Sequence, residues 1–303
     1  MEYPVSLFIM DVADSSRIDT PDALAEYLDQ TVGWIEELAS QNKTALSIRV
    51  KHRFGDEIIL VAEEFTTAYT LAFFIKNFWR YQQNPPYFGL TVGSLSQSVA
   101  QLPDLDRWLH PMINTARLAI DELKETKSVT DRQWLLMNAS ESPLQHSVEE
   151  TNELLEILDY LLKSQSTAQK TAGALYGVFQ QQAQIASYLN KDPSTISRQL
   201  KAGAADLIVK IHRRIEHRLV ELQSVYSASR TNAAVPGSPG FAPRSIADST
   251  AGSTADSTAD STAGSTAGST AGSNPPAPAT KTAELVASYI HSHLEQFVTG
   301  WIH

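Results

Sequence analysis

The stretch Val5-Ser-Leu-Phe-Ile-Met10 is a short apolar run of strand-forming residues, and Asp11 follows it directly. A run of this length and composition, ended by a charged side chain, is typical of a buried strand. The next segment begins at Thr20-Pro-Asp-Ala23, where a capping residue and a proline precede apolar residues at helical spacing. The chain is therefore predicted to begin with a strand and an amphipathic helix.

Patterns further along extend this order to strand, helix, strand, strand, helix, strand. Residues 45–50 alternate with period two and residues 58–62 are apolar and β-branched, while Phe54-Gly-Asp-Glu57 between them is turn chemistry that predicts a hairpin. Further elements are predicted as a helix over 66–81, a strand over 87–92, a helix over about 104–124 and a strand near 134–137. This order predicts an α+β domain over residues 1–145, with helices on one face of a sheet in the ferredoxin-like or palm arrangement.

The composition is that of a globular protein. The chain has 303 residues, 42% of them hydrophobic, a formal net charge of −10 and no cysteine. Disulfides, thiolate metal sites and cysteine nucleophiles are excluded, and contact with DNA would need a local basic patch on an acidic body. Because no leader pattern and no long apolar stretch is found, we expect a soluble, cytoplasmic protein that does not contact membrane.

Three further segments follow the α+β domain. Ser147-Val-Glu-Glu150 is a capping-box pattern that opens an all-helical domain, predicted over 147–228. Residues 229–280 contain Ala-[Asp/Gly]-Ser-Thr six times from Ala247 and offer no core, which predicts a disordered linker. Residues 281–303 predict an amphipathic helix that docks on protein, either on its own chain or on a second copy, because Lys281 is its only lysine or arginine.

Two carboxylates stand at positions that a palm-type sheet would bring together. Asp11 ends the first predicted strand, and Asp56 lies on the predicted hairpin at the same edge. Such a pair suits Mg²⁺ or Mn²⁺, which prefer oxygen ligands and leave room for substrate phosphates. Each aspartate also has an ordinary interpretation, because Gly-Asp is common in turns and an aspartate after a strand can cap a helix.

Three blocks resemble class III nucleotidyl cyclases. Phe8-Ile-Met-Asp-Val-Ala-Asp-Ser-Ser-Arg17 resembles the first metal loop of that family, and Val50-Lys-His-Arg-Phe-Gly-Asp-Glu57 resembles the second. Ile113-Asn-Thr-Ala-Arg117 resembles the helix that faces the ribose and the triphosphate. Joined to a helix-turn-helix behind them, these blocks look most like the SatD-type proteins.

The resemblance implies a role for each matching residue. Metal would be held by Asp11, Asp56 and the backbone carbonyl of Val12, and nucleotide would be contacted by Lys51, Asn114 and Arg117, the last two being the catalytic pair in an active enzyme. The chain departs from the cyclase pattern because Asn114 and Arg117 are three residues apart instead of four, Lys51 is one residue further from Gly-Asp, Asp14 replaces a glycine, and Phe54 stands where diguanylate cyclases have a glycine. These departures favour nucleotide binding without turnover, with an active nucleotidyl cyclase as the alternative.

Residues 181–200 have the spacing of a helix-turn-helix. Ile185 and Leu189 would pack inward, Asn190 can take the left-handed turn conformation, and Ile196 and Leu200 would anchor the second helix. Residues 191–218 contain seven Lys or Arg against three Asp or Glu, which is a local basic patch. We therefore expect contact with double-stranded DNA through Lys191, Ser194, Thr195, Ser197, Arg198 and Lys201.

The alternative for this segment is a three-helix bundle that contacts protein. His212 and His217 lie on the following helix and are interpreted as surface or groove-side residues. The combined hypothesis is a homodimeric, DNA-binding transcriptional regulator whose cyclase-like domain binds a nucleotide with Mg²⁺. A degenerate scaffold that makes only protein contacts is the third alternative, beside the active cyclase.

Overall fold

The computed structural model describes residues 2–53, 55–233 and 279–298. The α+β prediction is confirmed, and the chain has a five-stranded sheet with strand order β2-β3-β1-β4-β5. The first four strands pair antiparallel and β5 pairs parallel with β4. The elements of this part are β1 (Tyr3–Val12), α1 (Pro21–Gln41), β2 (Ile48–His52), β3 (Ile58–Glu63), α2 (Phe65–Asn77), β4 (Pro86–Leu95), α3 (Pro111–Glu125) and β5 (Leu135–Ala139).

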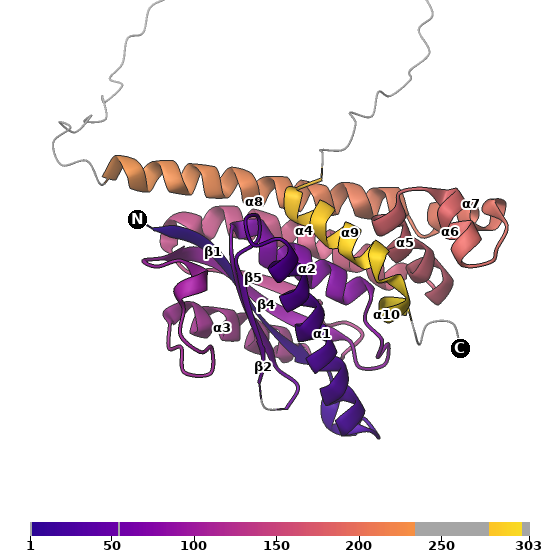
Figure 1. Ribbon diagram of the computed structural model, residues 1–303, viewed down its shortest axis with the longest axis horizontal. Helices are drawn as coiled ribbons and strands as arrows, with labels where there is room; N and C mark the ends of the chain where they lie inside the picture. Colours follow the sequence, from indigo (N-terminus) through magenta and orange to yellow (C-terminus); the bar gives the residue numbers. More distant parts are fainter. Residues whose placement is uncertain (1, 54, 234–278, 299–303) are drawn as a thin grey trace, which may run out of the picture.

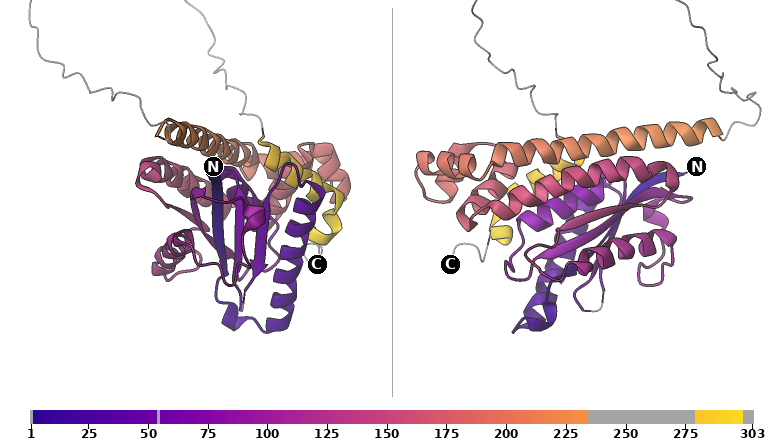
Figure 2. Two further views of the ribbon diagram at one scale, coloured as in Figure 1. Left: turned by 60° about the vertical axis from the view of Figure 1, so that its left-hand side comes forward. Right: turned by 180° about the vertical axis from the view of Figure 1, so that it is seen from behind.

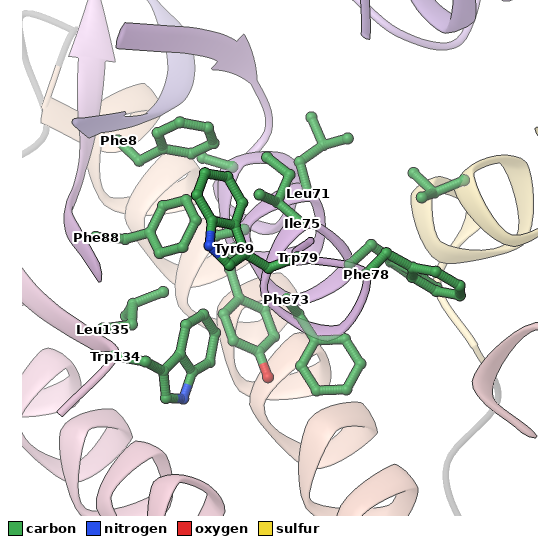
Figure 3. Packing of buried hydrophobic residues seen from close by; sticks show 14 of the residues in the cluster. Phe8, Tyr69, Leu71, Phe73, Ile75, Phe78, Trp79, Phe88, Trp134 and Leu135 are labelled. Carbon is green, nitrogen blue, oxygen red and sulfur yellow. The ribbon is translucent and has the colours of Figure 1, made fainter. Parts of the chain in front are cut away.

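Helices cover both faces of this sheet, whereas the sequence led us to expect them on one face (Figure 2). The reason lies in β1, where residues on both sides of the strand are apolar. Phe8 and Met10 pack in one buried cluster with residues of α1 and α2, and Leu7 and Ile9 pack in a second cluster with residues of α3. Figure 3 shows the aromatic centre of the first cluster, where Phe8 and Phe88 of the sheet lie beside α2.

The third predicted helix begins later than expected. It starts at Pro111 instead of near residue 104, because proline suits the first turn and the His110 side chain accepts a hydrogen bond from the Met112 amide at 3.3 Å. Residues 104–110 form a loop that contains Asp104 and Asp106. This loop matters for the site described below.

Residues 145–233 are mostly helical, as predicted, and pack closely on the sheet. One cluster of buried hydrophobic residues contains Leu135 of β5, Leu155 of α4 and Leu219 of α8, so residues on both sides of the predicted boundary near residue 146 share a core. Figure 1 shows α8 running along the length of the molecule, with α6 and α7 at one end. These helices are α4 (Gln145–Ser164), α5 (Thr167–Phe179), α6 (Gln182–Tyr188), α7 (Pro193–Ala202) and α8 (Ala205–Ala233).

The predicted terminal helix is found as α9 (Lys281–Ser292) and α10 (Leu294–Val298), and α9 docks on its own chain. It contacts α1, α2 and α5. The Tyr289 ring stacks on Trp34 of α1 at 6.1 Å, and its hydroxyl donates to Glu37 Oε2 at 2.6 Å. Most of the predicted linker, residues 234–278, lies outside the described residues, as do residues 299–303.

The interpretation of His212 as a surface residue is wrong. Its side chain is buried between α8 and α2, where it stacks on the Phe73 ring at 3.8 Å and hydrogen-bonds to the Tyr69 hydroxyl at 3.0 Å. One turn later, buried Glu216 accepts hydrogen bonds from Thr70 at 2.7 Å and from Thr280 at 2.8 Å. Because Thr280 caps α9, this polar network joins α8, α2 and the terminal helix.

Gly89 on β4 marks the closest approach of α3 to the sheet. A Cβ atom there would lie 2.1 Å from the carbonyl oxygen of Ala116 and 2.9 Å from Cγ1 of Ile120. Gly89→Ala is therefore expected to lower the free energy of unfolding by about 1–3 kcal/mol, because the backbone of α3 would have to move. The control is Gly33→Ala on the exposed side of α1, where nothing lies within 4 Å and a gain of about 0.5–1 kcal/mol is expected. Urea unfolding of both variants checks this, and a stabilising Gly89→Ala would contradict the packing of α3.

Candidate functional site

The structure brings the two predicted metal carboxylates together. Met10 pairs with Ile58, so the end of β1 lies beside the hairpin that contains Asp56. Burial raises the pKa of Asp11, a hydrogen bond and the charge of Lys124 lower it, and the charge of Asp56 and a hydrogen bond between the two carboxyl groups raise it again. The Asp11 and Asp56 carboxyl groups are therefore close enough to influence each other, and they place two acidic side chains at this edge of the sheet.

Two residues of this site were missed by the sequence reasoning. The Lys124 ammonium, on α3, lies 2.5 Å from Asp11 Oδ2. Tyr87 faces Asp11 across the β1–β4 pair, and burial together with the charge and hydrogen bond of Asp11 raises the pKa of its hydroxyl. The spacing of Lys124 offered a signal, because it stands seven residues after Arg117 on the same helix face. Tyr87 offered none, because strand register is set by tertiary pairing.

The remaining nucleotide-contact residues are spread around this edge. Arg117 donates to Glu57 Oε1 at 3.2 Å, directly beside Asp56, and Asn114 is exposed one turn earlier on α3. Val12 follows Asp11 on β1 and its side chain is buried. Lys51 is held by the loop before α3, with its ammonium 3.0 Å from Asp106 and 3.4 Å from Asp104, and both carboxylates raise its pKa.

The donor set fits Mg²⁺ in its chemistry. Asp11 and Asp56 supply two adjacent carboxylates, which is the number of protein ligands that this ion commonly takes beside waters and phosphates. Among the described residues there is no group of three or more histidines or acidic side chains that could hold a metal by themselves. Lys124 supplies the neutralising charge at Asp11, so a bound cation would compete with this lysine.

A second candidate site is formed by α6, α7 and the turn between them. Asn190 adopts the left-handed conformation with φ of 49°, as its position in the turn predicted. Ile185, Ile196 and Leu200 are buried in the contact between the helices and α5, and Pro193 occupies the first turn of α7. The local geometry is therefore that of two helices joined by a tight left-handed turn.

Most of the side chains that were predicted to contact DNA are exposed. Lys191, Ser194, Ser197, Arg198 and Lys201 are exposed and Thr195 is half-buried. Arg198 makes long contacts within its helix, to the Ser194 carbonyl and the Thr195 hydroxyl, both at 3.4 Å. In the part of the chain that the structure describes, no ion pair neutralises Lys191, Arg198 or Lys201.

Comparison with known proteins gives no relative. No protein-family model matches the chain. Neither a curated protein nor a solved structure matches it. Within the described residues, no helix has both the length and the apolar character needed to cross a membrane.

Proposed function

We propose that this chain is a DNA-binding transcriptional regulator that uses α6 and α7 as a helix-turn-helix. The observation that supports this best is the turn at Asn190, whose φ of 49° lets two short helices meet while their apolar sides are buried. Helix α7 lies at one end of the molecule (Figure 1), and its polar residues Ser194, Ser197 and Arg198 are exposed. A helix presented in this way is suited to the major groove of DNA.

The polar side of α7 has the chemistry that this proposal needs. Arg198 offers a guanidinium with no acidic partner among the described residues, and Ser194 and Ser197 offer hydroxyls on the same exposed side. Lys191 and Lys201 lie at the two ends of the helix, where phosphates of the two groove walls would pass. We assign base contacts to Arg198 and the serines, with Thr195 beside them, and phosphate contacts to the lysines.

We further propose that the α+β part is a palm-type, cyclase-like domain of the SatD kind that binds a nucleotide with Mg²⁺ as its signal. The order β4-β1-β3-β2 within the sheet and the meeting of Asp11 with Asp56 support this. Sensing is favoured over catalysis because the two cationic side chains that a cyclase would direct at its substrate form ion pairs within this chain. Lys51 pairs with Asp106, and Arg117 pairs with Glu57.

The DNA assignment predicts that Arg198→Ala weakens binding about 5- to 150-fold and relaxes sequence preference, because a bidentate base contact contributes about 1–3 kcal/mol. The measurement is fluorescence anisotropy with a duplex selected from a random pool. Arg107→Ala, an exposed arginine in the loop before α3, is the control and should bind as the wild type does. Unchanged affinity and preference in Arg198→Ala would remove α7 from the interface. Two half-sites about one helical turn apart in the selected duplexes would support the homodimer.

The nucleotide assignment predicts that Asp56→Asn abolishes Mg²⁺-dependent binding of a nucleoside triphosphate while stabilising the free protein. The raised pKa of Asp11 means that its carboxylate costs stability as pH rises through that pKa. Removing the charge of Asp56 lessens this cost, by up to about 1 kcal/mol at neutral pH. Calorimetric titration and thermal unfolding measure the two effects, with exposed Asp121→Asn as control.

The same experiment separates the alternatives. Loss of binding in a variant that melts at a higher temperature cannot be attributed to unfolding, so it would support the sensor. A cyclic product that forms in the wild type and disappears in Asp56→Asn would instead establish the nucleotidyl cyclase. Absence of both nucleotide and DNA binding in the wild type would leave the protein-contact scaffold.

A further inference from the structure

A cavity of about 460 Å³ lies where the end of α2, the start of β4 and the helices α4 and α5 meet. Its charged lining consists of Lys76, Arg80, Arg132, Lys163, Lys170 and the carboxylate of Asp159. Five cations against one carboxylate is an unusual concentration in a chain whose net charge is −10. None of these residues belongs to the carboxylate edge or to the helix pair described above.

Most of this positive charge is not neutralised by the protein. Lys163 pairs with Asp159 at 2.6 Å, which uses the one carboxylate of the lining. Arg132 stacks over the Tyr87 ring at 4.9 Å. For Lys76, Arg80 and Lys170, no ion pair or side-chain hydrogen bond is found within the described residues. Like charges gathered in this way repel one another unless an anion lies among them.

A buried donor without a partner and the start of a helix add to this picture. The Trp134 indole lines the cavity, its side chain is 3% exposed, and its N–H group has no hydrogen-bond partner among the described residues. A buried donor of this kind is rare in folded proteins unless a ligand or water completes it. Thr167, the first residue of α5, also lines the cavity, so the positive end of that helix lies beside the same space.

We propose that this cavity binds a small anion carrying phosphate groups. The lysines and arginines come from α2, from the segment that follows it, from the segment before β5, from α4 and from α5, so they surround the space from several sides. Phosphate groups are the anions that such a set of lysines and guanidinium groups recognises best. Tyr87 borders both places, because it lines the cavity and faces Asp11 across the β1–β4 pair.

An anion bound in the cavity would affect α7 through its contacts with α5. Lys170 and Thr167 of α5 line the cavity, and α5 packs against both α6 and α7. Immediately before α5, buried Gln165 donates to the Gly203 carbonyl at 2.6 Å, at the end of α7. An anion that draws α5 toward α2 and α4 would therefore alter the support of α7. This second step rests on the proposed DNA-binding function, whereas anion binding itself does not.

Calorimetric titration of the full chain with sodium pyrophosphate in the presence of EDTA tests the binding step. Lys76→Met and Lys170→Gln are each expected to weaken binding about tenfold or more, since each removes one charge-assisted contact. Asp159→Asn should strengthen pyrophosphate binding. The asparagine side chain keeps an oxygen that can accept from the Trp134 backbone N–H, whereas the negative charge of the carboxylate is lost. The control is Lys43→Met, because Lys43 is an exposed lysine in the loop after α1.

The outcomes are distinct. No binding of pyrophosphate by the wild type, or equal binding by wild type, Lys76→Met and Lys170→Gln, would overturn the site. Thermal melting of each variant shows whether it is folded, and Lys76→Met keeps an apolar side chain of similar length. ATP in EDTA should bind and adenosine should not, and adenosine binding as tightly as ATP would overturn recognition through phosphate.

The pH dependence gives a readout that a structural role would not change. Burial is the main cause that lowers the pKa of Lys76 to about 8; the charge of Asp159 opposes this shift, and the charges of Lys170 and Lys163 add to it. The cationic form binds the anion, so affinity should fall as pH rises from about 7 to about 9. In Lys76→Met, the fall in affinity that comes from the titration of Lys76 should be absent. The change in affinity that comes from the titration of pyrophosphate itself should remain. Identical pH profiles would remove Lys76 from the site.

The coupling step is tested by DNA anisotropy with and without pyrophosphate. A change in DNA affinity that occurs in the wild type and is absent in Lys76→Met supports it, and no change in a wild type saturated with pyrophosphate overturns it. If the chain binds pyrophosphate but no DNA at all, the proposed function fails while the anion site stands.

Discussion

Ile290→Asp is expected to release α9 and α10 from the body of the protein and to lower the free energy of unfolding by about 3–5 kcal/mol. Ile290 is fully buried, in the same cluster as residues of α1, α2 and α5. A carboxylate at this position would have no partner and would lie in apolar surroundings, which costs several kcal/mol. Because 45 residues of sequence, 234–278, separate the two helices from the rest of the described chain, the helices would leave the surface before the remaining core unfolds.

The matched control is Ser288→Asp, which adds the same charge on the exposed side of α9. Urea unfolding followed by tryptophan fluorescence measures both variants, since Trp34 stacks on Tyr289 and contacts Phe297 at 5.4 Å. A chain ending at residue 278 provides the reference for full release. If Ile290→Asp unfolds at the same urea concentration as Ser288→Asp, the docking of α9 on its own chain is wrong, and pairing with a second copy becomes the better account.

The parts that sequence predicted well are those decided by local patterns. The short apolar run ending at Met10 and the hairpin around Gly55-Asp56 have the lengths, residue types and turn chemistry that favour strands, so the order of elements followed. That order places Asp11 and Asp56 at the same edge of the sheet. Their meeting could therefore be predicted although no local feature links them.

The contacts of these carboxylates could not be predicted in the same way. Lys124 reaches Asp11 because α3 packs across β4 at Gly89, and the rotation of a helix on a sheet is a property of side-chain packing. Lys51 was predicted to contact a nucleotide. It pairs with Asp104 and Asp106 because the helix begins only at Pro111, which leaves a loop where a helical turn was predicted.

His212 shows how a local pattern can mislead. A histidine and a glutamate four residues apart on a polar helix are typical of an exposed pair. Here both residues are buried in the core, where His212 hydrogen-bonds to the Tyr69 hydroxyl and Glu216 Oε1 accepts from Thr70 of α2. The basic cavity could not be seen in the sequence for a related reason, because its five cations come from segments that only the fold brings together.

Trp79→Ala is expected to lower the free energy of unfolding by about 3–5 kcal/mol and to abolish pyrophosphate binding. Trp79 is 2% exposed, packs edge-on against Tyr27 of α1 at 5.1 Å, and donates its indole N–H to the Asn84 carbonyl at 2.8 Å. Asn84 in turn donates to the Ala13 carbonyl at 3.0 Å, just beyond β1. The tryptophan thus holds both the helix contact and the loop that forms one wall of the cavity.

Trp79→Phe separates these two roles. Phenylalanine keeps most of the packing against Tyr27 but cannot donate to Asn84, so a loss of about 1–2 kcal/mol is expected from the missing hydrogen bond and smaller ring. Urea unfolding gives the stability of each variant, and calorimetric titration gives its affinity for pyrophosphate. If the indole hydrogen bond positions the 80–85 loop, Trp79→Phe binds pyrophosphate more weakly than its small loss of stability explains. If packing alone matters, Trp79→Phe binds as the wild type does, and the loop is then held by the contact between Asn84 and Ala13.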